Sequence, residues 1–357
     1  MEKKPSGKSV STILAETYAD IFMDRFKNIN ADNWQKPWIT AHACPAQNIS
    51  GNIYSGFNQF FLSIISSMKG WEHPLFLTDK QCDRLGVLIN KGEHSFPIAC
   101  VKTWYKDERD QKRPTINPKA YDALDEEAKK GYVRKESLLY YKGYNISQTN
   151  FKDIRPEKMA QIVEQYKAVI DTTRDVSVPA IDKMIADQSW VCKIREQTSD
   201  QAYFSRREDA IVIPKREQFP DRGAFYGTLY HEMTHSTGVE SRLNREMGGF
   251  FGSMDYAREE LVAELSSAIL CTKSGLDASI SEHNLQYLKS WMEVLSEDPK
   301  AITQVVADAS KAADFISEKA KLDQRPTIDL SDIGKELKEA QEQSQNQTEN
   351  HHRGMHR

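Results

Sequence analysis

Two features that would place the chain outside a reducing cytoplasm are missing: paired cysteines and long apolar runs. The five cysteines are scattered at positions 44, 82, 100, 192 and 271. They form no C-x-x-C pair, which disfavours a disulfide framework and a cysteine-ligated zinc site. No stretch approaches the roughly 20 apolar residues of a transmembrane helix, and the first residues contain no signal-peptide core. We therefore expect a cytoplasmic protein without a membrane partner.

The chain also has little net charge, but its two halves differ in sign. The formal net charge is −4 over 357 residues. Residues 1–155 carry 23 Lys and Arg against 18 Asp and Glu, whereas the remainder carries 25 against 34. This length allows two domains with a sizeable core. A basic first half joined to an acidic second half favours contact with a polyanion through the first half alone.

The strongest motif is His231-Glu-Met-Thr-His235, which reads H-E-x-x-H. Residues four apart share one face of a helix, with Cβ atoms about 5–6 Å apart, so both imidazoles can bind one zinc ion. Glu232 points about 100° away around the helix and is the predicted general base beside a metal-bound water. Asp221 is the expected N-cap of this helix and Gly238 its expected end. The alternative is a pair of ordinary histidines on an amphipathic helix.

A catalytic zinc site needs a third protein ligand and an open position for water. A third histidine in the extended form of the motif is excluded because position 241 is Ser241. The next helix, expected to be capped by Asp255, carries Glu259, Glu260 and Glu264. We expect Glu260 to bind the metal and Glu264, one turn later, to orient a histidine. Any of the three glutamates could be the ligand, and all three could instead lie on a solvated helix face.

Short strands are expected before the motif, at residues 189–194, 202–205 and 209–214. The last strand ends in Pro214, which is typical of an edge strand. An edge beside the metal-binding helix would pair with an extended peptide substrate.

The predicted domains are residues 1–155 and residues 156–323, joined by a polar connection. From residue 324 the sequence is polar and rich in Glu and Gln. That composition predicts a disordered tail over residues 324–357. The histidines of the tail are expected to bind metal only adventitiously.

The first half interleaves aromatic residues with lysines, a pattern that suits single-stranded nucleic acid. Bases stack on such rings at about 1–3 kcal/mol each while lysines follow the backbone. Strands are expected over residues 96–106 and 138–146, separated by a highly charged segment, residues 107–136, that resembles an insertion. The alternative is that most of these aromatic side chains belong to the core. The candidate DNA-binding residues are Trp34, Lys36, Trp38, Tyr54, Lys91, Lys102 and Trp104.

These motifs together resemble the ArdC-type antirestriction proteins of conjugative plasmids. The resemblance extends through nearly the whole chain to about Phe315. It rests on residues 54–58, 91–93 and 144–148 in the first half, and on residues 209–214, 231–238, 240–244, 259–264 and 291–314 in the second. Ser55, Ser236 and Val239 depart from the residues common in that family.

The resemblance implies an α+β fold with an N-terminal single-stranded-DNA-binding domain and a C-terminal zincin-like metallopeptidase domain containing a small sheet. It adds Asn58 to the DNA-binding residues and implies a role in shielding incoming DNA from restriction. We expect a zinc-dependent hydrolase of the HExxH-plus-Glu class that also binds single-stranded DNA. The alternative is a DNA-masking protein whose metal domain is structural or gives specificity. The peptide substrate and the oligomeric state stay open, and Tyr226 and Tyr256 are the candidate oxyanion donors.

Overall fold

The computed structural model describes residues 9–27, 44–54, 56–110, 112–172, 177–245, 247, 253–278, 288–298, 300–322 and 325–354. Its first part comprises α1 (Val10–Lys27), β1 (Gln47–Asn48), α2 (Gly56–Lys69), β2 (Leu75–Thr78), α3 (Asp79–Leu85), β3 (Phe96–Asp107), α4 (Pro118–Asp122), α5 (Glu126–Lys129), β4 (Tyr132–Asn145), α6 (Phe151–Ile154) and α7 (Pro156–Thr172). Its second part comprises α8 (Pro179–Ala186), β5 (Lys193–Gln197), β6 (Tyr203–Ser205), β7 (Ala210–Pro214), α9 (Arg222–Thr237), α10 (Met254–Lys273), α12 (Leu288–Glu297), α13 (Ala301–Ala320) and α14 (Ser331–Gly354). The predicted α+β class is confirmed. No helix in the described ranges is both long and apolar enough to cross a membrane.

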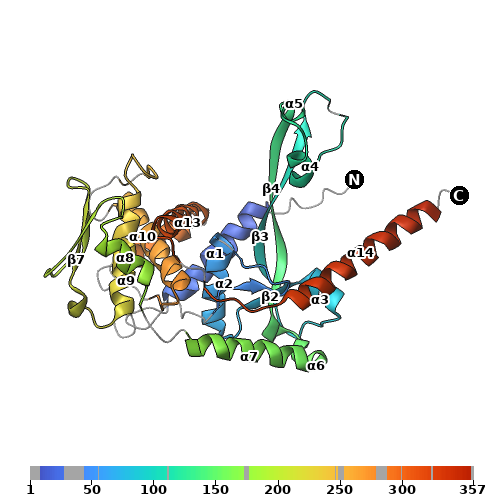
Figure 1. Ribbon diagram of the computed structural model, residues 1–357, viewed down its shortest axis with the longest axis horizontal. Coiled ribbons are helices and arrows are strands. Elements are labelled where there is room, and N and C mark those ends of the chain that lie inside the picture. Colours follow the sequence, from blue (N-terminus) through green and yellow to red (C-terminus); the bar gives the residue numbers. More distant parts are fainter. Residues whose placement is uncertain are drawn as a thin grey trace.

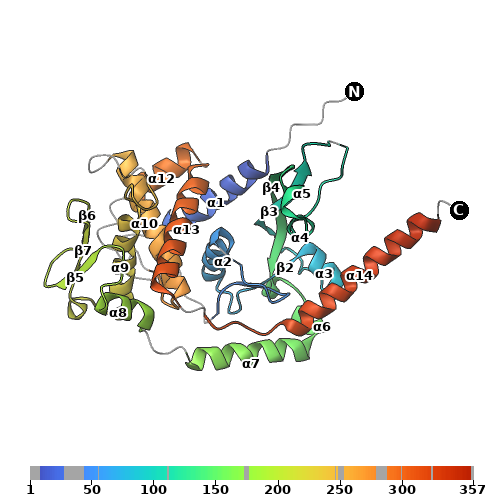
Figure 2. The same cartoon turned by 45° about the horizontal axis from the view of Figure 1, so that its top comes forward.

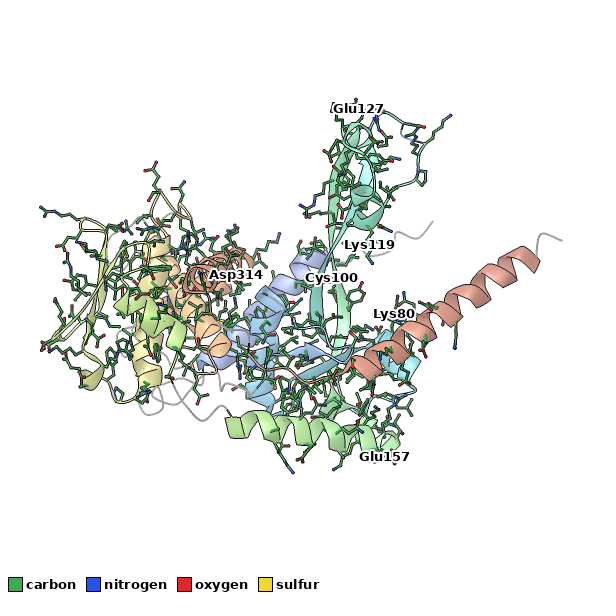
Figure 3. All side chains as sticks on the ribbon, viewed as in Figure 1. Lys80, Cys100, Lys119, Glu127, Glu157 and Asp314 are labelled. Atoms are coloured by element: carbon green, nitrogen blue, oxygen red, sulfur yellow. The ribbon has the colours of Figure 1, made fainter. Side chains whose placement is uncertain are left out.

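The first sheet has the strand order β1-β2-β4-β3. Its two long strands pair in antiparallel register from Phe96 opposite Gly143 to Asp107 opposite Tyr132. They form an arm, residues 96–145, that projects away from the rest of the molecule (Figure 1). The charged segment predicted as an insertion forms the tip of this arm, with α4 and α5 between the strands. Figure 3 shows Cys100 low on the arm, Lys119 a little above it and Glu127 at the tip.

The first two long helices belong to the core of the second part of the chain. Figures 1 and 2 show α1 and α2 beside α13, and α1 also contacts α12. Their buried residues, which share one apolar cluster with Leu229, Met233 and Leu265, are Leu14, Tyr18, Phe22, Phe60, Phe61 and Ile64. A fragment ending at residue 155 would expose these side chains to water. The boundary predicted at residue 155 therefore crosses a shared core.

The prediction of a disordered tail over residues 324–357 is wrong for the first part of that segment. Residues 325–337, which we call the C-terminal strap, lie along α7 and α3, and helix α14 begins within them. Ile328, Leu330, Ile333 and Leu337 are buried in a second core with residues of β2, α3 and α7. The polar composition of the later tail concealed these four apolar residues. Beyond the strap, α14 extends away from the molecule (Figure 1).

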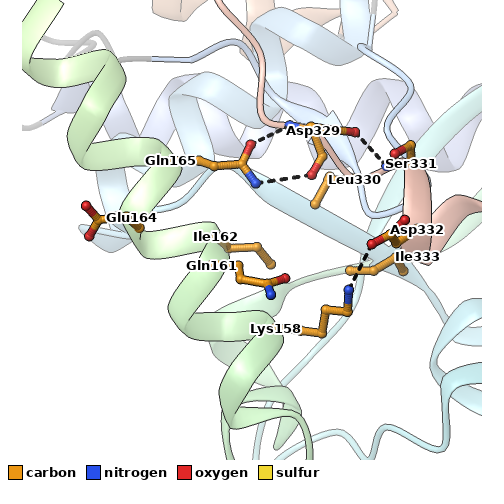
Figure 4. Close-up of a pocket in the computed structure, with 10 residues that line it drawn as sticks. All are labelled: Lys158, Gln161, Ile162, Glu164, Gln165, Asp329, Leu330, Ser331, Asp332 and Ile333. Carbon is orange, nitrogen blue, oxygen red and sulfur yellow. Dashed lines mark hydrogen bonds and ion pairs between the residues drawn. The ribbon is translucent and has the colours of Figure 1, made fainter.

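Polar contacts fix the strap against α7 (Figure 4). The side-chain amide of Gln165 donates to the carbonyl of Asp329 at 3.3 Å and accepts from its backbone nitrogen at 2.7 Å. Lys158 pairs with Asp332 at 3.1 Å, and Arg155 makes a two-point contact with Glu336 at 2.7 and 2.8 Å. A cavity of about 350 Å³ lies between strap and helix. Its apolar lining includes Ile162, Leu330 and Ile333, already part of the second core.

The second sheet has the strand order β5-β7-β6. The prediction that residues 209–214 form an edge strand is wrong, because β7 lies in the centre. It pairs in parallel with β5 and antiparallel with β6, and all five of its residues are buried. Pro214 is the last residue of the strand, opposite Gln197, where the ladder ends. A missing N–H is tolerated at that point. The edges of the described sheet are β5 and β6.

Candidate metal centre

Helix α9 carries the H-E-x-x-H motif. The Asp221 carboxylate accepts from the Ala224 backbone N–H at 2.8 Å, which confirms the predicted cap. The helix ends at Thr237, as predicted, but Gly238 has an ordinary right-handed conformation. A Cβ at this position would press against the Met247 and Arg245 side chains, which would have to shift. The apolar face of α9 is buried, and His231 and Glu232 are only 8% and 7% exposed.

Helix α10 supplies the carboxylates and packs against α9. Its N-cap is Ser253, whose hydroxyl accepts from the Tyr256 backbone N–H at 3.2 Å. The predicted cap, Asp255, lies instead in the first turn of the helix. The predicted apolar stripe of Leu261, Leu265 and Ile269 is buried.

The ligand atoms of His231, His235 and Glu260 converge within 4.8 Å of one another. The two Nε2 atoms are 3.1 Å apart. The Glu260 carboxylate lies 3.3 Å from Nε2 of His231 and 3.7 Å from Nε2 of His235. For an ion about 2.0–2.1 Å from both nitrogens, the N–metal–N angle would be about 100°, which is close to the tetrahedral value. These three residues could therefore hold a metal ion through two imidazoles and one carboxylate.

Two more carboxylates lie behind the histidines, on the side of their Nδ1 atoms. Glu264 is 3.5 Å from Nδ1 of His231, the position from which it was predicted to orient a histidine. Glu259 is 3.2 Å from Nδ1 of His235. This position of Glu259 was not predictable from the sequence, because it depends on how α10 crosses α9. A carboxylate on Nδ1 favours the tautomer whose Nε2 is free to bind a metal.

The electrostatics of the cluster favour a cation between the histidines and the carboxylates. Burial alone would raise the pKa of Glu260. The hydrogen bond from His231 and the charges of both histidines outweigh burial and lower this pKa to about 2. Burial likewise tends to lower the pKa of His231. Hydrogen bonds to Glu260 and Glu264, with the charge of Glu232, raise that pKa well above its usual value.

Glu232 and the two tyrosines complete the description of the predicted site. Glu232 follows His231 on the same helix, so its side chain leaves the helix about 100° away. The Tyr226 hydroxyl donates to Asp182 at 2.8 Å and accepts from the Val178 N–H at 3.1 Å. Because these two hydrogen bonds tie its hydroxyl to α8, Tyr226 is not an oxyanion donor. Tyr256 lies beside Glu260, to which it hydrogen bonds.

The candidate DNA-binding residues do not form one group. Trp34, Lys36 and Trp38 lie outside the described residues. The Tyr54 ring packs edge-on against Phe76, and its hydroxyl accepts from Asn48 at 2.9 Å. Burial raises the pKa of Tyr54 to about 12. Tyr54 is thus half-buried against a small apolar cluster, which favours the alternative interpretation of the aromatic pattern.

Asn58 and Lys91 are also apart from the arm's exposed surface. The Asn58 amide donates to the Ala99 carbonyl at 2.7 Å and accepts from the Ala99 N–H at 2.9 Å. It thus fixes the edge strand β3 to α2 through both the nitrogen and the oxygen of its amide. Lys91 is exposed in the turn between α3 and β3.

Two of the candidates share one face of the arm. Lys102 and Trp104 are two residues apart on β3, so their side chains point to the same side. Lys102 is exposed and Trp104 half-buried. Lys135, opposite Trp104 in the register, lies on that face as well. Lys135 was not among the predicted residues, because only the pairing of β3 with β4 places it opposite Trp104.

Each part of the chain matches a family model. A model of the N-terminal domain of the anti-restriction factor ArdC matches residues 13–146, and a zincin-like metallopeptidase model matches residues 179–308. The metal-free crystal structure of the antirestriction protein ArdC from the R388 plasmid is 26% identical, with a TM-score of 0.58 over 85% of this chain and 97% of that one. The chain therefore combines an ArdC-type N-terminal domain with a zincin-like metallopeptidase domain.

Three further proteins or structures are similar to this chain. A Mn(II)-bound structure of the R388 ArdC protein is 24% identical, with a TM-score of 0.59 over 86% of this chain and 98% of that one, and supports the fold. The DNA primase TraC of Escherichia coli is 28% identical over 289 residues, which are 79% of this chain and 25% of the primase. The chain thus spans about a quarter of that relative's length. The uncharacterized protein y4eC of Sinorhizobium fredii is 26% identical over 80% of this chain and 86% of its own.

Proposed function

We propose that the chain is a zinc-dependent metallopeptidase of the ArdC type that also binds single-stranded DNA. The observation that carries the peptidase part is the convergence of His231, His235 and Glu260 within 4.8 Å. Glu232 sits on the same helix in the order that metallopeptidases use. The match of residues 179–308 to a zincin-like metallopeptidase family supports the same chemistry.

Each residue has a distinct part in this proposal. His231 and His235 would hold the ion through their imidazoles, and Glu260 would hold it through its carboxylate. A bound zinc ion lowers the pKa of water and polarises a carbonyl group. Glu232 takes the proton of the attacking water as general base and returns it to the leaving amine. Tyr256 hydrogen bonds to Glu260 and so helps to hold that carboxylate beside the histidines.

Zinc is the metal that this ligand set fits best. Two imidazoles and one carboxylate, with one position open, are a frequent catalytic zinc set. Manganese prefers oxygen ligands in an octahedral arrangement. One R388 ArdC structure is nevertheless Mn(II)-bound, so affinities for both ions should be compared. We expect tighter binding of zinc.

The peptidase activity is tested by Glu232→Gln in the full chain. Glutamine keeps the shape of the side chain but cannot accept the proton from water. Zinc content should be unchanged, while cleavage of an unstructured protein such as casein should fall to background. Undiminished cleavage by this variant would remove Glu232 from the mechanism. If the wild-type protein binds zinc without cleaving any of a varied peptide library, the metal domain is structural or gives specificity.

DNA binding is the second function, and the exposed face of the arm carries it. Lys102, Trp104 and Lys135 lie on one side of two paired strands, which combines positive charge with an aromatic ring. This combination suits single strands because every base can stack on the ring. The match of residues 13–146 to the ArdC N-terminal domain and the likeness to a DNA primase support a DNA partner. Shielding of incoming DNA from restriction would follow from such binding.

A gel-shift series with the full chain tests the DNA part. Single-stranded oligonucleotides should bind more tightly than duplexes of equal length, because paired bases cannot stack on Trp104. Affinity should fall with salt and vary little with base sequence. Equal affinity for both forms, or no salt dependence, would contradict this function.

A further inference from the structure

Glu259 makes more contacts than an outer carboxylate behind a histidine requires. One of its oxygens lies 3.2 Å from Nδ1 of His235. The same oxygen accepts from Nη2 of Arg245 at 2.7 Å, and the other accepts from Nε of Arg245 at 3.1 Å. The guanidinium therefore grips the carboxylate with two parallel hydrogen bonds, the strongest geometry for this pair. Both side chains are nearly buried, with 7% and 8% exposure.

Arg245 also holds the end of the helix that carries His235. Its Nη2 donates to the Thr234 carbonyl at 2.8 Å, and its Nη1 donates to the Thr237 hydroxyl at 2.7 Å. The last carbonyls of a helix lack partners within the helix, so a guanidinium at this place stabilises the final turn. Arg245 thus connects the last turn of α9 to the first half of α10. Each helix contributes one member of the His235–Glu259 pair.

We propose that Arg245 is a positioning residue for the metal centre: it fixes Glu259 so that this carboxylate accepts the Nδ1 proton of His235. This inference rests on the proposed metal site. With its Nδ1 proton donated to Glu259, His235 is held in the tautomer whose Nε2 points at His231 and Glu260. Without Arg245, the carboxylate could rotate away, and His235 could adopt either tautomer.

The charge balance of the site gives Arg245 a second effect. Glu232, Glu259, Glu260 and Glu264 are all buried in the neighbourhood of the histidines. One divalent ion does not neutralise four carboxylates. The guanidinium offsets the charge of Glu259 directly, so this carboxylate remains a hydrogen-bond acceptor and does not compete with Glu260 for the metal.

Metal affinity, measured by competition with a chromophoric zinc chelator, tests the proposal. Arg245→Ala should lower the affinity by about 10–100-fold, the usual cost of losing an outer partner of a metal ligand. Arg245→Lys should recover only part of it, because an ammonium group cannot form the two-point grip. The visible absorption spectrum of the Co(II)-loaded protein should also change in Arg245→Ala, since the spectrum reports the orientation of His235.

Arg242 provides the matched control, because its hydrogen bonds and ion pair brace the same loop and involve neither Glu259 nor the two histidines. It donates to the carbonyls of Ser236 and Val191 and pairs with Asp209 at 2.6 Å. Arg242→Ala should therefore retain the wild-type metal affinity and the Co(II) spectrum. An equal loss in Arg242→Ala and Arg245→Ala would show general loosening of the loop and overturn the proposal.

If Arg245→Ala does not fold, the proposal can be tested by comparing the metal affinities of Glu259→Gln and Glu259→Ala. Glutamine retains an oxygen that accepts from Nδ1, and alanine does not. The proposal expects a smaller loss of affinity in Glu259→Gln than in Glu259→Ala. Equal losses, or wild-type affinity in Arg245→Ala, would contradict it. Absence of metal binding by the wild-type protein would instead contradict the proposed function.

Discussion

Gln47 and Ile328 are bound to each other by two hydrogen bonds across 281 positions of the sequence. The Gln47 side chain donates to the Ile328 carbonyl at 3.1 Å and accepts from its backbone nitrogen at 2.9 Å. Both residues are buried. The C-terminal strap is thereby part of the core beneath the first sheet, although it follows the metal domain in the chain.

The strap should contribute measurably to stability. Leu330 is 3% exposed, and replacing a buried leucine with alanine costs about 2–5 kcal/mol. Leu330→Ala should therefore lower the thermal unfolding midpoint. Glu342→Ala, on the exposed part of α14, should change stability by no more than about 0.5 kcal/mol. Equal midpoints for Leu330→Ala and the wild type would mean that the strap is not docked in solution.

The arm face should control the salt dependence of DNA binding. Removing Lys102 and Lys135 together should make the log–log salt slope less negative by about 0.7 for each lysine that neutralises a phosphate. Trp104→Ala should cost about 1–3 kcal/mol with little change in slope, because it removes stacking and not charge. Lys80→Ala is the control, since Lys80 is exposed on α3, off the arm (Figure 3). If Lys80→Ala lowered the DNA affinity as much as Lys102→Ala, binding would depend on the general positive charge of the surface and not on the arm face.

The tip of the arm should loosen in acid. Asp107 has a fully buried carboxylate that accepts from Arg109 at 3.0 Å and from Arg113 at 2.9 Å. The hydrogen bond from Arg109 is the main cause that lowers the pKa of Asp107 from 3.8 to about 2. Because the folded-state pKa is the lower one, this contribution is complete above about pH 4 and is lost as the pH falls through about 2.

Hydrogen exchange of peptides from residues 108–131, corrected for the intrinsic effect of pH, measures this loss. Protection in the wild type should decrease towards pH 2 more than protection in α13. Asp107→Asn should have low protection in the tip at every pH. Protection of the wild-type tip that stays constant down to pH 2 would contradict the role given to Asp107.

Glu232 separates the two proposed functions in cells. A plasmid without protective methylation is transferred into a restricting host, and its survival is compared between variants. If DNA binding carries protection, Glu232→Gln should protect as well as the wild type, whereas the double variant Lys102→Ala, Lys135→Ala should not. Loss of protection in Glu232→Gln with wild-type DNA affinity would assign protection to hydrolysis.

Local signals in the sequence were enough to predict which side chains meet at the candidate metal centre. His231, Glu232 and His235 are fixed by the geometry of one helix, and Asp221 caps that helix as predicted. Glu260 was chosen from three nearby glutamates on helical spacing, and it is the one near both Nε2 atoms. The long strands β3 and β4 were also predictable, because alternation and β-branched or aromatic residues mark them.

Features that depend on distant neighbours were not predictable. Pro214 suggested an edge strand, but β7 is central, since strand order is decided by which segments pair in three dimensions. The strap was hidden because a few apolar residues precede a long polar stretch. A role for Arg245 was not predictable from the sequence, because its partner Glu259 lies 14 positions later, on α10. Asn58 matched a family motif, yet its amide is used by the backbone of β3.

The metal content of the purified full-length protein tests the central claim most directly. We expect about one zinc ion per chain in the wild type and its loss in His231→Ala and Glu260→Gln, because each removes one of three protein ligands. A variant with His351, His352 and His356 replaced by alanine controls for adventitious binding by the tail and should keep the ion. Full zinc retention in His231→Ala, or loss of zinc in the tail variant alone, would contradict the assignment of His231, His235 and Glu260 as the metal centre.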